Sequence, residues 1–421
     1  MLKKIKKEFK QSSNFLTFMG IKSAGLVILA LIPMILAGVL GPQSFGSYSL
    51  CMMIVFFFST LLIRSPQSPF IVYGAKEYNK TGKINLAFSG RLILFALGVL
   101  IFFIVSFLCS DLILKFTSIN KVQFWFLLSA FFGLSFQILI HNIFFILDKR
   151  KTAVGYNLLT STVSAIIILF LYRYLTLKLE YVFLIWLVAP VISGIFMIRN
   201  IDFKKLIPFE LDKALLNKML NYTKWVMIGG TAVYFVNWGD NLVLRYFTSI
   251  SEIGVYNLGY SIFKGISTLS GAVTMYFFTS VARAIDNPKK IKIYLYNRRP
   301  RIIAFSIICI SALFISLPYI FNFIYGEEYM GSSLTAQVLL LASLFAIYWS
   351  MYGPIFSSLE RYRFIQISHI FFVLLNLSLD VVFVKHYGYI GAAIATTISY
   401  AVMGVIYEFY FRKYCKAQLS A

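Results

Sequence analysis

The amino-acid sequence predicts an all-α integral membrane protein with twelve transmembrane helices, arranged as two pseudo-symmetric six-helix bundles. Composition is the first reason. Of the 421 residues, 59% are hydrophobic and 13% are charged, whereas a soluble protein has about a quarter of its residues charged. The other two reasons are the length of the apolar runs and the alternating placement of the basic residues between them.

Twelve apolar runs are long enough to cross the hydrocarbon core of a bilayer, which is about 30 Å thick. They are too long for tilted barrel strands, and no backbone group can stay unpaired in lipid, so we predict helices. The first run is too long for a signal peptide and has no A-x-A cleavage site, so we interpret it as an uncleaved span. In chain order, the predicted spans 1 to 12 are 15–40, 48–73, 86–109, 122–147, 153–172, 181–198, 224–246, 254–279, 301–324, 333–358, 364–384 and 390–411.

Basic residues fix the predicted orientation. Thirty of the 39 Lys and Arg residues fall in seven alternate segments that include both chain ends, and six fall in the loops on the opposite side. Basic residues mark the cytoplasmic side of a membrane protein. We therefore predict a multi-pass protein of the cytoplasmic (inner) membrane with both termini cytoplasmic. We therefore attribute the net charge of +23 to membrane orientation and to contact with anionic membrane lipids, and not to nucleic-acid binding.

Two short segments recur along the chain. FGSYSL at 45–50 resembles IGVYNL at 253–258, and IFFILDKRK at 143–151 resembles IFSSLERYR at 355–363, with offsets of 208 and 212 residues. Six spans per half is an even number, so both halves enter from the same side and form a parallel repeat, as in transporters that rock one bundle against the other. The predicted domains are an N-terminal bundle (1–198), a cytoplasmic linker (199–223) and a C-terminal bundle (224–421).

Three basic residues remain inside the predicted spans: Lys22, Arg64 and Lys264. An ionisable residue in hydrocarbon costs several kcal/mol unless it faces a cavity or a partner, so each is a candidate cargo-binding residue. Lys264 lies near the midplane of span 8; it either contacts an anionic cargo or forms a buried ion pair with Asp240. Arg64 precedes two prolines that break the helix, which predicts a kinked span lining a wet cavity. Lys22 is close enough to the cytoplasmic end of span 1 to snorkel instead.

Fewer acidic residues than basic ones lie deep in the spans. Asp240 lies in a polar turn of span 7 and is a candidate for proton or sodium coupling, or for a helix-packing hydrogen bond. His141 and His369 are candidate proton or cargo contacts, although a lone histidine in a span more often packs. Asp111 and Asp380 lie near span ends. The resulting bias to positive charge favours phosphate or acidic sugar as cargo and disfavours organic cations.

Motifs of enzymes are missing from the sequence. No P-loop, kinase, zinc or nucleophile-elbow motif stands in a credible context, and the four cysteines are scattered. The short outer loops leave no room for a catalytic domain. We therefore predict a transporter rather than an enzyme, with no cofactor, driven by an H+ or Na+ gradient, by the gradient of its cargo or by a partner.

Several motifs resemble one family. LGPQSFGSY at 40–48 resembles the first outer loop of Wzx-type polysaccharide flippases, which belong to the multidrug/oligosaccharidyl-lipid/polysaccharide (MOP) exporter superfamily. Asp240 with IGVYNLGY at 253–260, IYGEEY at 324–329, and Leu375-Asn376-Leu377 with HYGYIGAAIATTISY at 386–400 resemble its second half. The resemblance covers nearly the whole chain, and its packing and turn motifs specify a MATE/MOP-like fold better than a cargo.

The resemblance implies a flippase for polyprenyl-diphosphate-linked oligosaccharide repeat units of a surface polysaccharide such as O-antigen, capsule or lipopolysaccharide. The head group would pass through a cationic cavity by alternating access, and polymerase and assembly proteins would be partners. One departure bears on coupling: many relatives carry an Asp-Gly pair in span 2, where this chain has Arg64-Ser65-Pro66. Alternatives are a multidrug or cation antiporter of the same superfamily, a peptidoglycan-precursor flippase, and a membrane enzyme of polysaccharide assembly.

Overall fold

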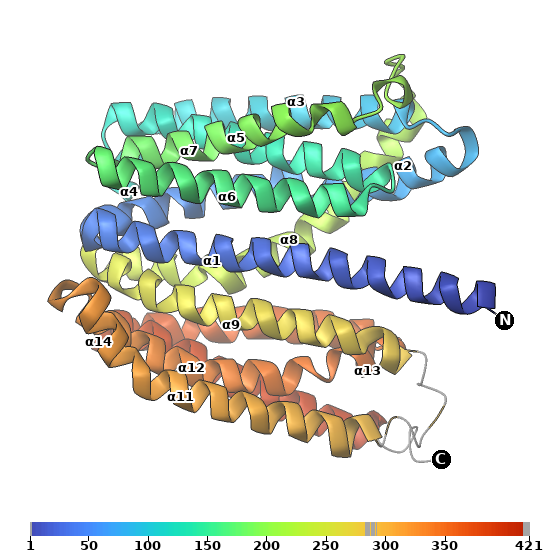
Figure 1. Ribbon diagram of the computed structural model, residues 1–421. Coiled ribbons are helices and arrows are strands. Elements are labelled where there is room, and N and C mark those ends of the chain that lie inside the picture. The colour runs from blue at the N-terminus through green and yellow to red at the C-terminus, as the bar shows by residue number, and fades with distance from the viewer. Residues whose placement is uncertain (1, 283–286, 288–290, 292, 416–421) are drawn as a thin grey trace. The chain divides into compact units, whose positions relative to one another are not determined.

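The computed structural model describes residues 2–282, 287, 291 and 293–415, and every regular element in these ranges is a helix (Figure 1). The predicted all-α class is confirmed. Two of the seven predicted basic segments are 283–301 and 411–421, and parts of both lie outside the described residues.

Eight helical stretches of the described chain are long and apolar enough to cross a membrane. Two of them, Gly20–Thr81 with 62 residues and Arg363–Tyr414 with 52 residues, are long enough for two crossings each. They break at Gly41 and Gly388, where φ is +73° and +59°, a backbone conformation that glycine adopts readily. Together with two long, more polar helices, α8 (Lys213–Phe247) and α9 (Ile250–Ala282), these stretches give the predicted twelve transmembrane helices.

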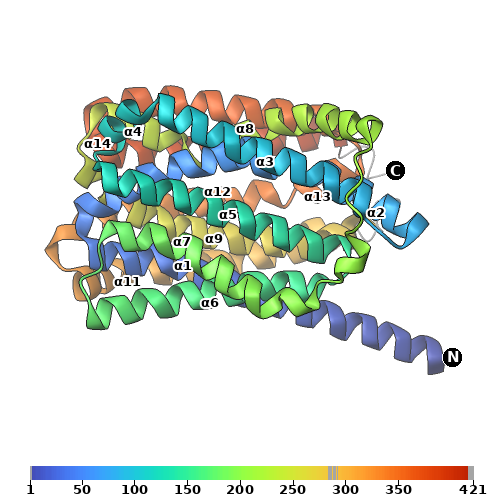
Figure 2. The same ribbon diagram turned by 90° about the horizontal axis from the view of Figure 1, so that it is seen from above.

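The chain divides into two compact units. The N-terminal unit comprises Met1–Leu40 and Leu50–Tyr234, and the C-terminal unit comprises Gly41–Ser49 and Phe235–Ala421. In the N-terminal unit, α5 packs along α7, and α6 packs against both (Figures 1 and 2). Its elements are α1 (Leu2–Phe58), the π-helix η1 (Ser59–Arg64), α2 (Gln67–Thr81), α3 (Asn85–Leu108), α4 (Ser110–Thr117), α5 (Lys121–Ile146), α6 (Arg150–Tyr174), α7 (Leu179–Met197) and the first part of α8.

The C-terminal unit is built around α12, which packs against α9, α11 and α14. Its elements are the end of α8, α9, the π-helix η4 (Tyr294–Arg298), α11 (Arg299–Tyr325), α12 (Met330–Ser350), α13 (Gly353–Ser358), α14 (Tyr362–Tyr410) and the π-helix η6 (Phe411–Cys415). Helices dominate because lipid offers no hydrogen-bond partners, so each segment must satisfy its own backbone.

The second sequence repeat forms the same turn in both units. Asp148 and Glu360 both have φ of +58°, which is uncommon for residues other than glycine. In one turn the Lys149 N–H donates to the Phe144 carbonyl at 2.9 Å; in the other the Arg361 N–H donates to the Phe356 carbonyl at 2.8 Å. This identical backbone geometry supports the predicted pseudo-symmetry of the two six-helix bundles.

The first sequence repeat packs against its own copy. A Cβ atom added to Gly254 would collide with the Pro42 carbonyl and lie 3.1 Å from the Gly46 nitrogen, and one added to Gly46 would collide with the Ile250 carbonyl. All these residues belong to the C-terminal unit. The glycines shared by the two copies therefore let two backbones approach closely, as small residues do between membrane helices.

The segment predicted as a linker, 199–223, is part loop and part helix. Helix α8 begins at Lys213, because Asp212 Oδ1 accepts hydrogen bonds from the Ala214 and Leu215 N–H groups and caps its N-terminus. The preceding loop is ordered on the N-terminal unit: the Ile84 N–H donates to the Lys205 carbonyl at 2.9 Å, and Leu206 is buried. The segment predicted as the linker therefore includes both this loop and the first turns of α8.

Candidate functional site

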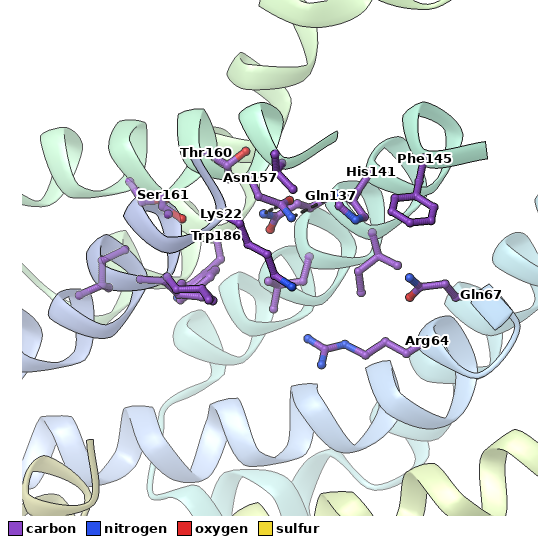
Figure 3. A pocket seen from close by; sticks show the side chains of 18 of the residues that line it. Lys22, Arg64, Gln67, Gln137, His141, Phe145, Asn157, Thr160, Ser161 and Trp186 are labelled. Atoms are coloured by element: carbon purple, nitrogen blue, oxygen red, sulfur yellow. Dashed lines mark hydrogen bonds between the residues drawn. The ribbon is translucent and has the colours of Figure 1, made fainter. Parts of the chain in front are cut away.

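A cavity of about 440 Å³ lies within the N-terminal unit, lined by side chains of α1, η1, α2, α5, α6 and α7. Its volume falls in the range of small-molecule binding sites, about 300–1,000 Å³. Polar residues face it, and all of them except Ser164 are labelled in Figure 3. Those residues are Lys22, Arg64, Gln67, Gln137, His141, Asn157, Thr160, Ser161 and Ser164, with Trp186 among the apolar ones.

Arg64 ends the π-helix η1, and its guanidinium extends into the cavity (Figure 3). The side chain is exposed, and its guanidinium carbon lies 5.7 Å from the centre of the Phe56 ring. The helix break predicted from the prolines is confirmed: Pro66 has no N–H to donate, α2 restarts at Gln67, and Ser65 Oγ donates to the Thr60 carbonyl at 2.7 Å. Such breaks are tolerated in membranes where neighbouring groups satisfy the freed carbonyls.

Arg91 supplies one of those neighbouring groups, and sequence reasoning missed it. The sequence analysis counted it among the thirty basic residues of the predicted cytoplasmic segments, but it lies in α3 and is 0% exposed. Its Nη2 donates to the Ile63 carbonyl at 2.8 Å, one residue before Arg64. A cation at the carboxyl end of a helix is favourable, because the free carbonyls there carry partial negative charge. Arg91 therefore holds the broken end of the helix that presents Arg64.

Lys22 and the neutral polar residues complete the cavity. The ammonium group of Lys22 is directed toward the Arg64 guanidinium (Figure 3). His141 Nδ1 lies 3.1 Å from the Ala153 carbonyl and 3.2 Å from Asn157 Nδ2, and Gln137 Nε2 donates to Asn157 Oδ1 at 3.3 Å. The two contacts use Nδ1 in opposite roles: protonated, it donates to the Ala153 carbonyl, and unprotonated, it accepts from Asn157 Nδ2. Both leave Nε2 as the ring atom for other contacts. These side chains offer the donors and acceptors that sugar hydroxyl groups need.

The lining of this cavity contains no Asp or Glu. The ion pairs recorded among the described residues, Arg150–Asp148, Lys205–Asp202 and Arg412–Glu408, involve neither Lys22 nor Arg64. Two fixed cations in a recess of low dielectric attract an anion more strongly than they would in water. The arrangement suits a phosphate or diphosphate, with Arg64 able to bind two oxygens at once.

The C-terminal unit contains a buried polar cluster of the opposite charge. Tyr256 Oη and Thr396 Oγ1 both donate to Asp240 Oδ2, the latter at 3.1 Å. Asn376 Nδ2 donates to Thr396 Oγ1 at 3.4 Å. All four of these side chains are buried. Asp240 therefore lies in a hydrogen-bonded cluster with side chains of α9 and α14, one of the alternatives considered for it from the sequence.

Asp380 belongs to the same cluster, which sequence reasoning missed because it placed Asp380 near a span end. Its carboxyl is 0% exposed and lies within hydrogen-bonding reach of Asp240. In the described part of the chain, Asp240 Oδ1 and both Asp380 oxygens lack a hydrogen-bond donor. Two adjacent buried carboxylates repel each other, so a shared proton or a bound cation is needed between them. The predicted span ends at 384, whereas the helix that carries Asp380 continues to the break at Gly388.

Two predicted site residues lie in the C-terminal unit, outside the lining of the N-terminal cavity. Lys264 is exposed, and its Nζ lies 4.8 Å from the centre of the Trp238 ring, a cation–π contact. His369 Nδ1 contacts the Ile365 carbonyl of its own helix at 2.6 Å, and its ring packs edge-on against Trp349. The structure thus brings Lys22, Arg64 and His141 together, and it places Asp240 with Asp380.

Comparisons with known proteins agree with this architecture. The family model described as "Polysaccharide biosynthesis protein" matches residues 10–282. A probable low-salt glycan biosynthesis flippase, Agl15 of Haloferax volcanii, is 22% identical over 198 residues, which are 47% of this chain and 42% of that protein. The uncharacterized membrane protein MJ1068 of Methanocaldococcus jannaschii is 22% identical over 221 residues, 49% of this chain and 41% of that protein. The matches span less than half the length of these relatives.

Solved structures share the fold. The lipid II flippase MurJ in an inward closed conformation superposes with a TM-score of 0.76 at 15% identity, covering 96% of this chain and 88% of that one. An inward-facing multidrug resistance MATE family transporter of the MOP superfamily gives a TM-score of 0.71 at 15% identity, covering 96% and 99%. The predicted twelve-helix MATE/MOP-like fold is confirmed. With a family model that matches well over half of its length, the chain belongs to the polysaccharide biosynthesis protein family.

Proposed function

We propose that this protein flips polyprenyl-diphosphate-linked oligosaccharide repeat units from the cytoplasmic to the outer leaflet by alternating access. The N-terminal cavity binds the diphosphate through Arg64 and Lys22. Gln137, His141 and Asn157 bind the first sugars, and the lipid tail stays in the membrane. One observation carries the proposal: the cavity has two cations and no carboxylate in its lining.

The cavity chemistry favours this cargo over that of a cation antiporter. A site for an organic cation needs a negative charge or a cage of aromatic rings, and Arg64 and Lys22 would repel such a cargo. A diphosphate brings the opposite charge, and the amide and hydroxyl groups around it match a sugar. Lys264, stacked on Trp238, is a second candidate contact for the anionic head group.

The buried cluster of the C-terminal unit is the proposed coupling site. Asp240, Asp380, Asn376 and Thr396 offer hard oxygen ligands of the kind that bind Na+, and the adjacent carboxylates could instead share a proton. Binding there would supply the energy for a conformational switch. His141 and His369 remain candidate proton contacts. We place both termini on the cytoplasmic side of the inner membrane, following the basic residues, with a polysaccharide polymerase and assembly proteins as partners.

The test is a flipping assay in proteoliposomes. The probe is a polyprenyl-diphosphate-linked disaccharide that carries a reducible dye on the sugar, with dithionite added outside. Wild-type protein should expose nearly all of the dye, whereas empty vesicles protect about half. Arg64→Ala should slow flipping by about 10- to 150-fold, because a hydrogen bond to a charged group contributes about 1.5–3 kcal/mol. Arg173→Ala, at the exposed end of α6, is the matched control and should flip at the wild-type rate.

A second probe separates the alternatives. Flipping of a polyprenyl diphosphate that carries the peptidoglycan precursor, at a rate above that of the disaccharide probe, would favour a precursor flippase. Transport of a fluorescent organic cation that survives Arg64→Ala would favour an antiporter. Wild-type flipping by a protein that carries both Arg64→Ala and Lys22→Ala would overturn the proposal.

A further inference from the structure

A second hollow lies in the C-terminal unit, between α11, α12 and α14, with a volume of about 560 Å³. Its walls are apolar side chains such as Ile307, Phe345, Val405 and Phe409, and Gly404 leaves room in its floor. A Cβ atom added to Gly404 would lie 3.6 Å from Tyr348 Cδ1, so a larger side chain there would extend into the hollow. None of the residues proposed for transport lines it.

The apolar wall of this groove faces outward. Val405 is 70% exposed and Phe409 is 62% exposed, on a helix long and apolar enough to cross a membrane. On a transmembrane helix such side chains face hydrocarbon. A groove of this depth in a lipid-facing surface fits an extended hydrocarbon chain, because an empty apolar hollow would lose the contacts that a chain supplies.

One end of the groove is polar and is held rigidly. Glu408 accepts hydrogen bonds from Tyr348 Oη at 2.6 Å and from Tyr352 Oη, and its other oxygen pairs with Arg412 Nε at 2.5 Å. The buried Arg299 guanidinium stacks on the rings of Tyr348 and Tyr352, with its carbon 4.4 and 4.0 Å from their centres. The Glu408 charge is therefore used within the protein, and Arg299 adds a positive charge beneath it.

Arg412 is the exposed charged group at this polar end of the groove, which we call its mouth. Its side chain is 71% exposed, and the Glu408 contact engages only Nε, which leaves the two Nη groups to bind a ligand. Lys413 adds a second cation, with its Nζ 5.7 Å from the centre of the Phe409 ring in the groove wall. An oriented guanidinium binds a phosphate through two hydrogen bonds.

We propose that this groove binds an anionic glycerophospholipid, with one acyl chain along the apolar wall and the headgroup phosphate at Arg412. The occupant is an amphiphile because the site joins an apolar groove to a cationic mouth. The mouth lies at the carboxyl end of α14, in the segment that the basic residues assign to the cytoplasmic leaflet, where anionic lipids attract Lys and Arg by about 1 kcal/mol each. The site lies apart from the proposed cargo cavity and does not depend on the cargo.

Lipid titration followed by native mass spectrometry of the full-length protein tests the site. We expect phosphatidylglycerol to bind at least tenfold more tightly than phosphatidylcholine with the same acyl chains. Arg412→Gln should remove that preference, because it deletes the charge at the mouth, and Arg412→Lys should keep part of it. Gly404→Leu should weaken binding of both lipids by filling the groove. Arg363→Gln, which changes an exposed arginine at the other end of α14, should leave binding within twofold.

Three outcomes would overturn the proposal. The first is equal binding of phosphatidylglycerol and phosphatidylcholine by the wild-type protein. The second is unchanged binding of both lipids in Gly404→Leu. The third is Arg412-dependent binding of farnesyl phosphate that exceeds that of phosphatidylglycerol, which would assign the groove to a polyprenyl chain. If Arg412→Gln does not fold, Arg412→Lys carries the test instead. It keeps the positive charge but lacks the two parallel N–H groups of the guanidinium, so the preference for phosphatidylglycerol should fall only in part.

Discussion

The N-terminal cavity and the polar cluster of the C-terminal unit occupy related bundles but carry opposite charge. The cavity has Lys22 and Arg64 in its lining and no carboxylate. The cluster has Asp240 and Asp380 side by side, both almost fully buried. The turns at Asp148 and Glu360 have the same backbone geometry in the two units. The units therefore share this turn while their polar sites differ in charge.

This contrast suggests a division of labour. An accessible cationic recess suits a large anionic head group, which must enter and leave. A sealed pair of acids suits a small ion or a proton, which needs few ligands and little space. Each charge pattern can be reversed or neutralised without touching the other unit, so the division can be tested residue by residue.

Reversing the cavity charge should have the largest effect. Arg64→Glu places a carboxylate where the diphosphate binds, and like charges at close range cost several kcal/mol. We expect head-group affinity to fall by about 1,000-fold, measured by equilibrium binding of the disaccharide-linked polyprenyl diphosphate. The neutral polyprenol-linked disaccharide should bind the variant and the wild type equally. An equal loss for both ligands would mean that the substitution disturbs the fold rather than the charge.

Neutralising one acid of the cluster should have a smaller and different effect. Asp380→Asn and Asp240→Asn each remove the repulsion that a proton or cation must relieve. We expect flipping driven by a Na+ or pH gradient to fall by about 10- to 100-fold, to the rate seen without a gradient, while head-group affinity stays within twofold. Asp111→Asn, at the exposed end of α4, is the control. Full gradient dependence in both variants would remove the cluster from the coupling mechanism.

Substitutions of Arg91 can distinguish an effect on head-group binding from an effect on the stability of the N-terminal unit. It is fully buried, and its Nε and Nη1 lack partners among the described residues, so Arg91→Met should keep or raise the melting temperature. The same change frees the Ile63 carbonyl and loosens the helix end that carries Arg64. We expect head-group affinity to fall by about tenfold, since one net hydrogen bond is worth roughly 1 kcal/mol or more, with Arg91→Lys in between. Lower stability with unchanged affinity would make Arg91 a purely structural residue.

Much of the fold could be predicted from the sequence because its signals are local. Apolar runs and the two prolines after Arg64 each act within a few residues, and the helices of the structure follow them. The pairing of Asp240 with Asp380 could not be predicted, because it joins helices separated by 140 positions in the chain. Arg91 was misassigned for a related reason: a base near a span end usually snorkels to water, and only tertiary contacts show that this one turns inward.

The matching turns give the finest comparison of the two units, with the smallest expected effect. Asp148 and Glu360 share a φ of +58°, a conformation in which aspartate is strained less than glutamate because its short side chain bonds locally. Replacement by glycine relieves the strain but increases the freedom of the unfolded chain. We expect Glu360→Gly to stabilise the protein by up to about 1 kcal/mol and Asp148→Gly to stabilise it less, because Asp148 also loses its exposed ion pair with Arg150 at 3.0 Å. Thermal unfolding in detergent measures both. Destabilisation by Glu360→Gly alone would mean that the two turns, although alike in backbone geometry, are held by different forces, and that the repeat has diverged in its scaffold as well as in its charges.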